Sequence, residues 1–229
     1  MLALVIDTSS AAVTAGVVDC AVDTAQGGPR VLSEQVIVNA RGHGERLAPL
    51  IRQALAEAGA GMIDLTAVIA GVGPGPFTGL RVGLVTAAAI SDARGIPAYD
   101  VCSLDAIAAG TVEPRRLLVA TDARRREVYW ARYVAGRRVG EPAVAKPADL
   151  PGEAEELADA MVGAGARLYA DLLRLPLLDD VDHDYPAVRG LGLLAADRVR
   201  SGAPTEPLTP LYLRRPDAVE PVASKTVSQ

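Results

Sequence analysis

Three groups of residues in this 229-residue chain have types and spacings that could do chemistry. The first is the polar run Asp7, Thr8 and Ser9, which directly follows an apolar stretch. A carboxylate flanked by hydroxyl groups can hold Mg²⁺ through water and contact a phosphate group. The same residue types are also favoured in any tight turn. The run therefore predicts either a vestigial nucleotide-binding turn or a purely structural one.

The second group is a glycine-rich stretch at residues 71–83, which reads GVGPGPFTGLRVG. It lacks the Lys of a P-loop and the third glycine of a dinucleotide-binding fingerprint. Pro74 and Pro76 have no N–H group, so two donors of a backbone phosphate nest are missing. We expect these glycines to let a helix pack closely on a strand, with phosphate binding as the secondary alternative.

The third group is Asp122 with the arginines 124–126 that follow it. Arginines could contact phosphate, but a short charged run is typical of a solvated surface. His43 and His183 are the only histidines, and neither has a second ligand at metal-site spacing. No nucleophile motif is present either. The sequence therefore predicts few catalytic residues and no metal site in this chain.

Composition narrows the class of protein further. Half of the residues are hydrophobic, yet no apolar run reaches the roughly 18 residues of a membrane helix, and the start does not resemble a signal peptide. Cys20 and Cys102 lack metal or redox spacing, so we expect reduced thiols and a cytoplasmic protein. The net charge of −5 argues against a chain that grips nucleic acid alone.

Hydrophobic periodicity predicts a mixed α/β protein. Three strand-like runs lie within residues 2–38, a helix is expected over about 45–58, a buried strand over 65–73, a second helix over about 78–94, and a strand over 96–101. Residues 115–134 repeat the first hairpin, with Asp122 in the place of Asp7. This predicts a duplicated unit; a single large α/β domain is the alternative.

The second predicted helix has small residues every fourth position, at Gly79, Gly83 and Ala87. Another helix can approach such a face closely. Most of the remaining surface of this helix is apolar, which predicts burial on several sides, partly against another subunit. An ordinary internal helix packed on the sheet explains the same pattern.

Four segments together resemble the bacterial TsaB (YeaZ) family: LALVIDTSSAAVTAGVVD, the stretch from GVGPGPFTGLRVG through IPAYDVCSLDAIA, LLVATDARRREVYWARY, and PLYLR. The resemblance implies the two-lobed actin/sugar-kinase/Hsp70-like fold with a reduced second lobe. We expect a first lobe over residues 1–99, a second over 100–215, and a loosely held tail over 216–229.

The resemblance also implies a function. TsaB proteins act in forming N6-threonylcarbamoyladenosine at position 37 of tRNAs that read codons beginning with A. They serve as a non-catalytic dimerisation and activation subunit for a TsaD-like catalytic paralogue, alongside a TsaE-like ATPase, and pair with themselves when alone. ATP and metal are then expected on the partners, no cofactor on this chain, and tRNA contact only through the complex. TsaD carries two metal-binding histidines where Ser103 and Ile107 stand here, so this chain does not resemble the catalytic paralogue at that site.

In that family the first-lobe helices form the partner surface. We expect the contacts to come from the two predicted helices, from Arg46, Leu47, Leu50, Ile51, Ala54, Thr78, Gly79, Arg81, Val82, Gly83 and Val85. Three rival functions remain: an ATP-dependent phosphotransferase that uses Asp7, a glycoprotease-like peptidase, and a homodimer without other partners.

Overall fold

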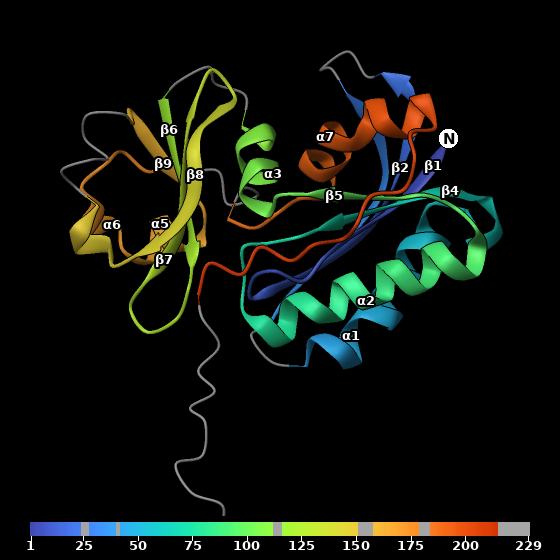
Figure 1. The fold of residues 1–229 in the computed structure, drawn as a ribbon, viewed down its shortest axis with the longest axis horizontal. Coiled ribbons are helices and arrows are strands. Elements are labelled where there is room, and N and C mark those ends of the chain that lie inside the picture. Colours follow the sequence, from blue (N-terminus) through green and yellow to red (C-terminus); the bar gives the residue numbers. More distant parts are fainter. Residues whose placement is uncertain (24–27, 40–41, 112–115, 151–157, 179–183, 215–229) are drawn as a thin grey trace, which may run out of the picture.

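The computed structural model describes residues 1–23, 28–39, 42–111, 116–150, 158–178 and 184–214, and consists of two β-sheets flanked by helices (Figure 1). The first sheet has the strand order β3-β2-β1-β4-β5, and the second has the order β8-β7-β6-β9. In the described part of the chain, no helix is both long and apolar enough to cross a membrane.

The first sheet combines an antiparallel meander with two parallel strands. The meander comprises β1 (Leu2–Asp7), β2 (Ala12–Asp23) and β3 (Pro29–Val38). The parallel strands are β4 (Leu65–Gly71), which pairs with β1, and β5 (Ala98–Val101), which pairs with β4. Strands β1 and β4 are almost continuously apolar because helices cover both faces of the sheet.

Three long helices provide that cover (Figure 1). Helices α1 (His43–Glu57) and α2 (Phe77–Arg94) lie on one face, and α7 (Val188–Ser201) lies on the other. The 3₁₀ turn η1 (Met62–Asp64) connects α1 to β4. Gly95, with a φ of 61°, ends α2 in the left-handed conformation that glycine adopts without strain.

The second sheet repeats part of the first. Its strands are β6 (Arg116–Asp122), β7 (Val128–Val134), β8 (Arg137–Ala145) and β9 (Ala160–Val162). Strand β6 is antiparallel to β7 and parallel to β9, as β1 is to β2 and β4. Among the described residues, its helical elements are α3 (Ser103–Gly110) and three shorter ones: η2 (Pro147–Asp149), α5 (Ala164–Leu168) and α6 (Ala170–Leu173). The predicted two-lobed α/β fold with a reduced second lobe is confirmed.

The predicted division of the chain near residue 99 needs a correction, because the chain returns to the first lobe after the second sheet. Helix α7 packs its buried residues Val188, Leu191 and Ala195 against Val5 and Tyr99 of the first sheet. Residues 203–214, called the C-terminal arm below, then run along β5. The predicted tail, 216–229, lies outside the described residues.

Candidate functional site

In the turn after β1, residues 7–10, the first three residues are buried and Ser10 is partly buried; we call it the first turn. Asp7 is 1% exposed. Its Oδ1 accepts hydrogen bonds from the Ser9 N–H (2.9 Å) and the Ser9 hydroxyl (2.8 Å), and its Oδ2 accepts one from the Ser103 hydroxyl (2.6 Å). Burial raises the pKa of the Asp7 carboxyl above 3.8, although these hydrogen bonds favour its charged form. The carboxylate is bound within the chain.

Glycines of the stretch 71–83 close the first turn. A Cβ on Gly75 would lie 2.7 Å from the carbonyl carbon of Ser9, and one on Gly71 would lie 2.7 Å from Cγ of Asp7. At Gly83 the N–H donates to Oγ1 of Thr8 (2.9 Å), where a Cβ would lie 2.5 Å from the same oxygen. Only glycine allows this approach, so the stretch holds the first turn against α2.

This packing corrects the predicted nucleotide-binding role of Asp7, Thr8 and Ser9. All three are buried, and Thr8 donates its hydroxyl hydrogen to the Gly79 carbonyl (2.8 Å). A bound Mg–nucleotide would need these groups to face a cleft, which the fold does not allow. Part of the signal in the sequence was the four-residue spacing of Gly79 and Gly83, which places both on one face of α2.

The equivalent turn of the second lobe, residues 122–127, stays open; we call it the arginine turn. Oδ1 of Asp122 accepts the Arg124 N–H at 2.9 Å, the same two-residue offset that Asp7 has with Ser9. The Ala123 N–H donates to the Glu127 carbonyl at 2.9 Å and closes the loop. Arginines 124–126 are exposed and have φ values of 62°, 54° and 62°. This left-handed run is unusual for residues with side chains.

The arginine turn borders a cavity of about 600 Å³ between the lobes. Arg124 and Ser10 line it together with the first turns of α1 and α2. A smaller cavity of about 210 Å³ shares Arg124 and Ser10 and extends to Tyr185. Nε2 of His43 lies 2.9 Å from the Ser10 carbonyl oxygen. Because a carbonyl oxygen is not a nucleophile, this contact is not a catalytic pair. Among the described residues, no three His, Cys, Asp or Glu side chains gather in a way that could hold a metal ion.

The outer side of α2 presents an exposed stripe, called the α2 face below: Phe77, Arg81, Val85, Ala88 and Asp92. Val85 is 66% exposed although it is apolar and lies in the middle of the helix. The guanidinium carbon of Arg81 lies 3.7 Å from the centroid of the Phe77 ring, and its Nε donates to the Tyr212 hydroxyl at 2.9 Å. Phe77 and Val85 are thus two exposed large apolar side chains on one side of the same helix, with Arg81 fixed between them.

The expected partner-contact residues divide by exposure. Thr78, Arg81 and Val85 are exposed, and Arg46, Gly79 and Val82 are partly buried. Five others are buried, so their predicted contact with a partner is corrected: Leu47, Leu50, Ile51, Ala54 and Gly83. Four of them form the apolar stripe of α1, which faces the sheet of its own lobe because that burial stabilises the fold. Gly83 is covered by Thr8.

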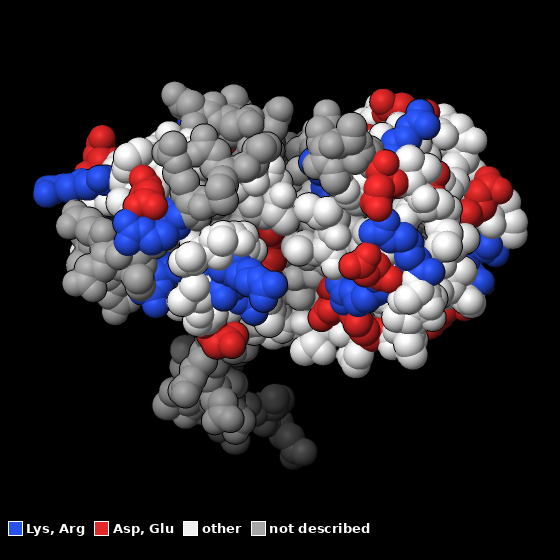
Figure 2. Space-filling model, turned by 90° about the horizontal axis from the view of Figure 1, so that it is seen from above, with Lys and Arg blue, Asp and Glu red and all other residues white. Residues whose placement is uncertain are grey.

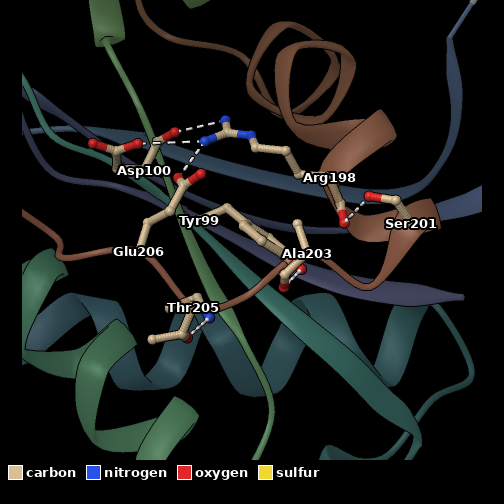
Figure 3. Close-up of polar contacts among 8 residues, drawn as sticks. Tyr99, Asp100, Arg198, Ser201, Ala203, Thr205 and Glu206 are labelled. Atoms are coloured by element: carbon tan, nitrogen blue, oxygen red, sulfur yellow. Dashed lines mark hydrogen bonds and ion pairs between the residues drawn. The ribbon is translucent and has the colours of Figure 1, made fainter.

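The C-terminal arm was not predicted from the sequence; polar contacts fix its first residues against β5 and α7 (Figure 3). The Glu206 N–H donates to the Ala98 carbonyl at 3.0 Å, so the arm covers the edge of β5. Arg198 of α7 donates to the Asp100 carbonyl at 2.8 Å and forms ion pairs with the carboxylates of Asp100 and Glu206. The Tyr99 hydroxyl donates to the Ala203 carbonyl at 2.7 Å. These contacts hold the arm beside α2.

The arm and α2 enclose a groove of about 500 Å³. Val85 and Ala88 line it from the helix, and Leu208 and Tyr212 line it from the arm. The apolar surface beside the α2 face therefore extends from the helix onto the C-terminal arm. Only PLYLR within this segment was noted from the sequence, and no local pattern in it indicates pairing with an edge strand.

Comparison with known proteins adds a family signal over most of the chain. The family model for the TsaD tRNA N6-adenosine threonylcarbamoyltransferase matches residues 30–176. An uncharacterized protein of Mycobacterium tuberculosis is 50% identical over 216 residues, which are 94% of this chain and 92% of that protein. The tRNA threonylcarbamoyladenosine biosynthesis protein TsaB of Escherichia coli is 31% identical over 76% of this chain and 81% of its own length.

Not every relative has the same length. An uncharacterized protein of Mycobacterium leprae is 48% identical over 95% of this chain, but the chain spans only 56% of that protein. Among solved structures, a Pseudomonas aeruginosa protein described as similar to the peptidase YeaZ matches with a TM-score of 0.72 and 30% identity, covering 93% of this chain and 99% of its own. These matches include both lobes.

Proposed function

Because the chain belongs to the TsaB (YeaZ) family, we propose that it is the non-catalytic subunit of a complex that forms N6-threonylcarbamoyladenosine at position 37 of tRNAs reading A-starting codons. In this role it binds and activates a TsaD-like catalytic paralogue, a TsaE-like ATPase joins the assembly, and ATP and metal act on those partners. The observation that carries the proposal is the exposed α2 face on a lobe in which Asp7, Thr8 and Ser9 of the first turn are buried.

The closed first turn supports a role without catalysis. A phosphotransferase of this fold would need Asp7 in a cleft, whereas the carboxylate is 1% exposed and bonded to Ser9 and Ser103. Ser103 stands where TsaD carries a metal-binding histidine, and its hydroxyl is engaged by Asp7. The rival function is tested by incubating the purified chain with Mg–ATP. We expect no turnover; turnover that disappears on Asp7→Ala in a variant that is still folded would instead establish an ATP-using enzyme.

The chemistry of the α2 face supports docking of another helix. Residues 81, 85, 88 and 92 follow helical spacing, so Arg81 and Asp92 mark the two ends of one stripe. At 1.5 Å per residue these ends lie about 16 Å apart, with Val85 and Ala88 between them. A second copy of α2 laid antiparallel would place each Arg81 against the Asp92 of the other copy. This self-complementarity supports a homodimer when the catalytic paralogue is absent.

The docking proposal is tested by mixing the chain with the catalytic paralogue of the same cell. Val85→Glu should weaken co-elution and tRNA modification by about thirtyfold or more, because a charge would be buried in an apolar contact. The matched control is Val139→Glu, which adds the same charge at a 41% exposed valine of the second lobe. Equal binding by both variants would refute the α2 face as the docking surface.

A further inference from the structure

The arginine turn has a costly backbone conformation at three consecutive residues. A left-handed φ costs a residue with a side chain roughly 1–2 kcal/mol, and three consecutive arginines adopt it here. Glycine would adopt the same conformation without strain. Backbone strain of this kind persists mainly at sites where it positions a functional group. The turn places three consecutive arginine residues at the surface.

Two acidic residues bracket the turn and offset part of its positive charge. Asp122 accepts the backbone N–H of Arg124 and also forms an ion pair with Nε of Arg124 at 3.9 Å, and Glu127 forms an ion pair with Arg214 of the arm. Residues 116–150 contain eight Lys or Arg and four Asp or Glu, a net charge of +4, in a chain whose total is −5. The remaining residues therefore carry −9. The positive charge of this protein is concentrated in the strands and turns around β6–β8.

The cavity beside the turn adds to this positive potential. The first turns of α1 and α2 both open into it. Among the described residues no side chain caps either helix start, so backbone N–H groups and the positive ends of two helix dipoles face the same space as Arg124. Glu45 is the acidic residue of the lining, and it is exposed on α1. The cavity is thus suited to an anion.

We propose that the arginine turn binds the phosphate backbone of RNA in the assembled complex. This inference rests on the proposed function and goes beyond the indirect tRNA contact expected there. Guanidinium groups pair with phosphate oxygens through two parallel hydrogen bonds, and three in a row suit successive phosphates better than one small anion. A Mg–nucleotide is disfavoured because Asp7 is sealed.

The distribution of charged side chains over the surface explains why RNA binding would require the whole complex. On the face drawn in Figure 2, acidic and basic side chains alternate, so no continuous positive field covers it. A chain with a net charge of −5 gains little non-specific affinity for RNA. The arginine turn therefore supplies a few phosphate contacts to an RNA that the partner subunits hold as well.

The test uses the complex of this chain with its catalytic paralogue and a fluorescein-labelled tRNA transcript that reads A-starting codons. The double variant Arg125→Gln/Arg126→Gln should weaken tRNA binding by about five- to tenfold. It should also lower the slope of log affinity against log salt by about 1 to 2, as expected for two lost phosphate contacts. The control, Arg30→Gln/Arg137→Gln, removes two exposed arginines outside the turn and should change affinity less than about twofold.

Each outcome bears on the inference separately from the proposed function. Unchanged affinity and salt slope in the double variant, with co-elution of the paralogue intact, would overturn the inference alone. Loss of co-elution in the double variant would make the turn a protein contact and would also overturn it. Binding of labelled ADP to the arginine turn of the isolated chain, together with unchanged tRNA binding by the double variant, would also overturn the inference. Failure of the wild-type chain to bind the paralogue would instead remove the proposed function.

Discussion

The first turn and the arginine turn occupy equivalent places in the two lobes but differ in solvent exposure. Each follows the first strand of its sheet, and each begins with an Asp whose Oδ1 accepts the N–H two residues on, at 2.9 Å. Asp7 is buried, whereas the side chain of Asp122 is 29% exposed. The turn whose residue types suit nucleotide binding is thus buried, and the turn that carries three arginines is exposed.

The helix that follows the parallel strand explains the difference. In the first lobe, β4 leads through the glycine-rich stretch into the 18-residue α2, which lies over the first turn. In the second lobe, β9 leads through Gly163 into α5, which has only five residues. Gly165 makes the same kind of close approach, since a Cβ there would lie 2.6 Å from the Thr121 carbonyl carbon. The short helix leaves the arginine turn uncovered.

The largest expected effect comes from forcing the first turn open. Gly75→Ala places a methyl group 2.7 Å from the Ser9 carbonyl carbon, in backbone that cannot swing aside. We expect a loss of about 3 kcal/mol or more in the free energy of unfolding, measured by urea titration. Gly44→Ala is the control, because nothing lies within 4 Å of its Cβ and alanine favours a helix. Equal stability of the two variants would show that α2 does not seal the turn.

Removing the two aspartates compares the turns directly. Asp7→Ala leaves the Ser9 N–H and the hydroxyls of Ser9 and Ser103 without their acceptor in a buried site, which should cost about 2–3 kcal/mol. Asp122→Ala removes one acceptor in a solvated turn and should cost about 1 kcal/mol or less. Thermal unfolding of both variants gives the comparison. A larger loss for Asp122→Ala would reverse our description of which turn is structural.

The pH dependence of stability separates the two aspartates further. Burial raises the pKa of Asp7 above 3.8, so the folded state binds this proton more tightly than the unfolded state. The stabilisation from the protonated form is complete below pH 3.8 and is lost as the pH rises through the folded pKa. Asp7→Asn should therefore gain stability relative to wild type as the pH increases over this range. A difference that stays constant from pH 3 to 8 would contradict a buried, desolvated carboxyl.

The smallest effect concerns the strain of the arginine turn. Arg125→Gly adopts a φ of 54° without penalty and should raise the free energy of unfolding by up to about 1 kcal/mol, after the greater freedom of glycine in the unfolded chain is subtracted. The same variant should bind tRNA more weakly within the complex. A loss of stability in calorimetry would show that the turn is not strained.

Much of the fold follows from local patterns. The strands of the first sheet, helices α1 and α2 within two residues, and the placement of Asp7 and Asp122 after equivalent strands were predicted correctly. These features depend on hydrophobic period, turn residues and helix-ending glycines, which are read over short stretches. The duplication was visible for the same reason.

The site was harder to predict because it depends on contacts across the chain. The apolar stripe of α1 was assigned to a partner, but Leu47 and Leu50 bury it in their own lobe. Sequence period shows that a helix has an apolar side and does not show what covers it. The pairing of the C-terminal arm with β5 joins Glu206 to Ala98, more than a hundred residues apart. No local pattern encodes such a contact.

The central claim is that the α2 face is where the catalytic paralogue binds, and a spin label reports on it directly. A nitroxide on Val85→Cys and another on Val139→Cys should both be mobile in the isolated chain, since both valines are exposed. Because Cys20 is buried and Cys102 partly buried, labelling of the unsubstituted chain gives the background. Adding the paralogue should immobilise the label at position 85 and leave that at position 139 mobile. A label at position 85 that stays mobile in a formed complex would contradict the account.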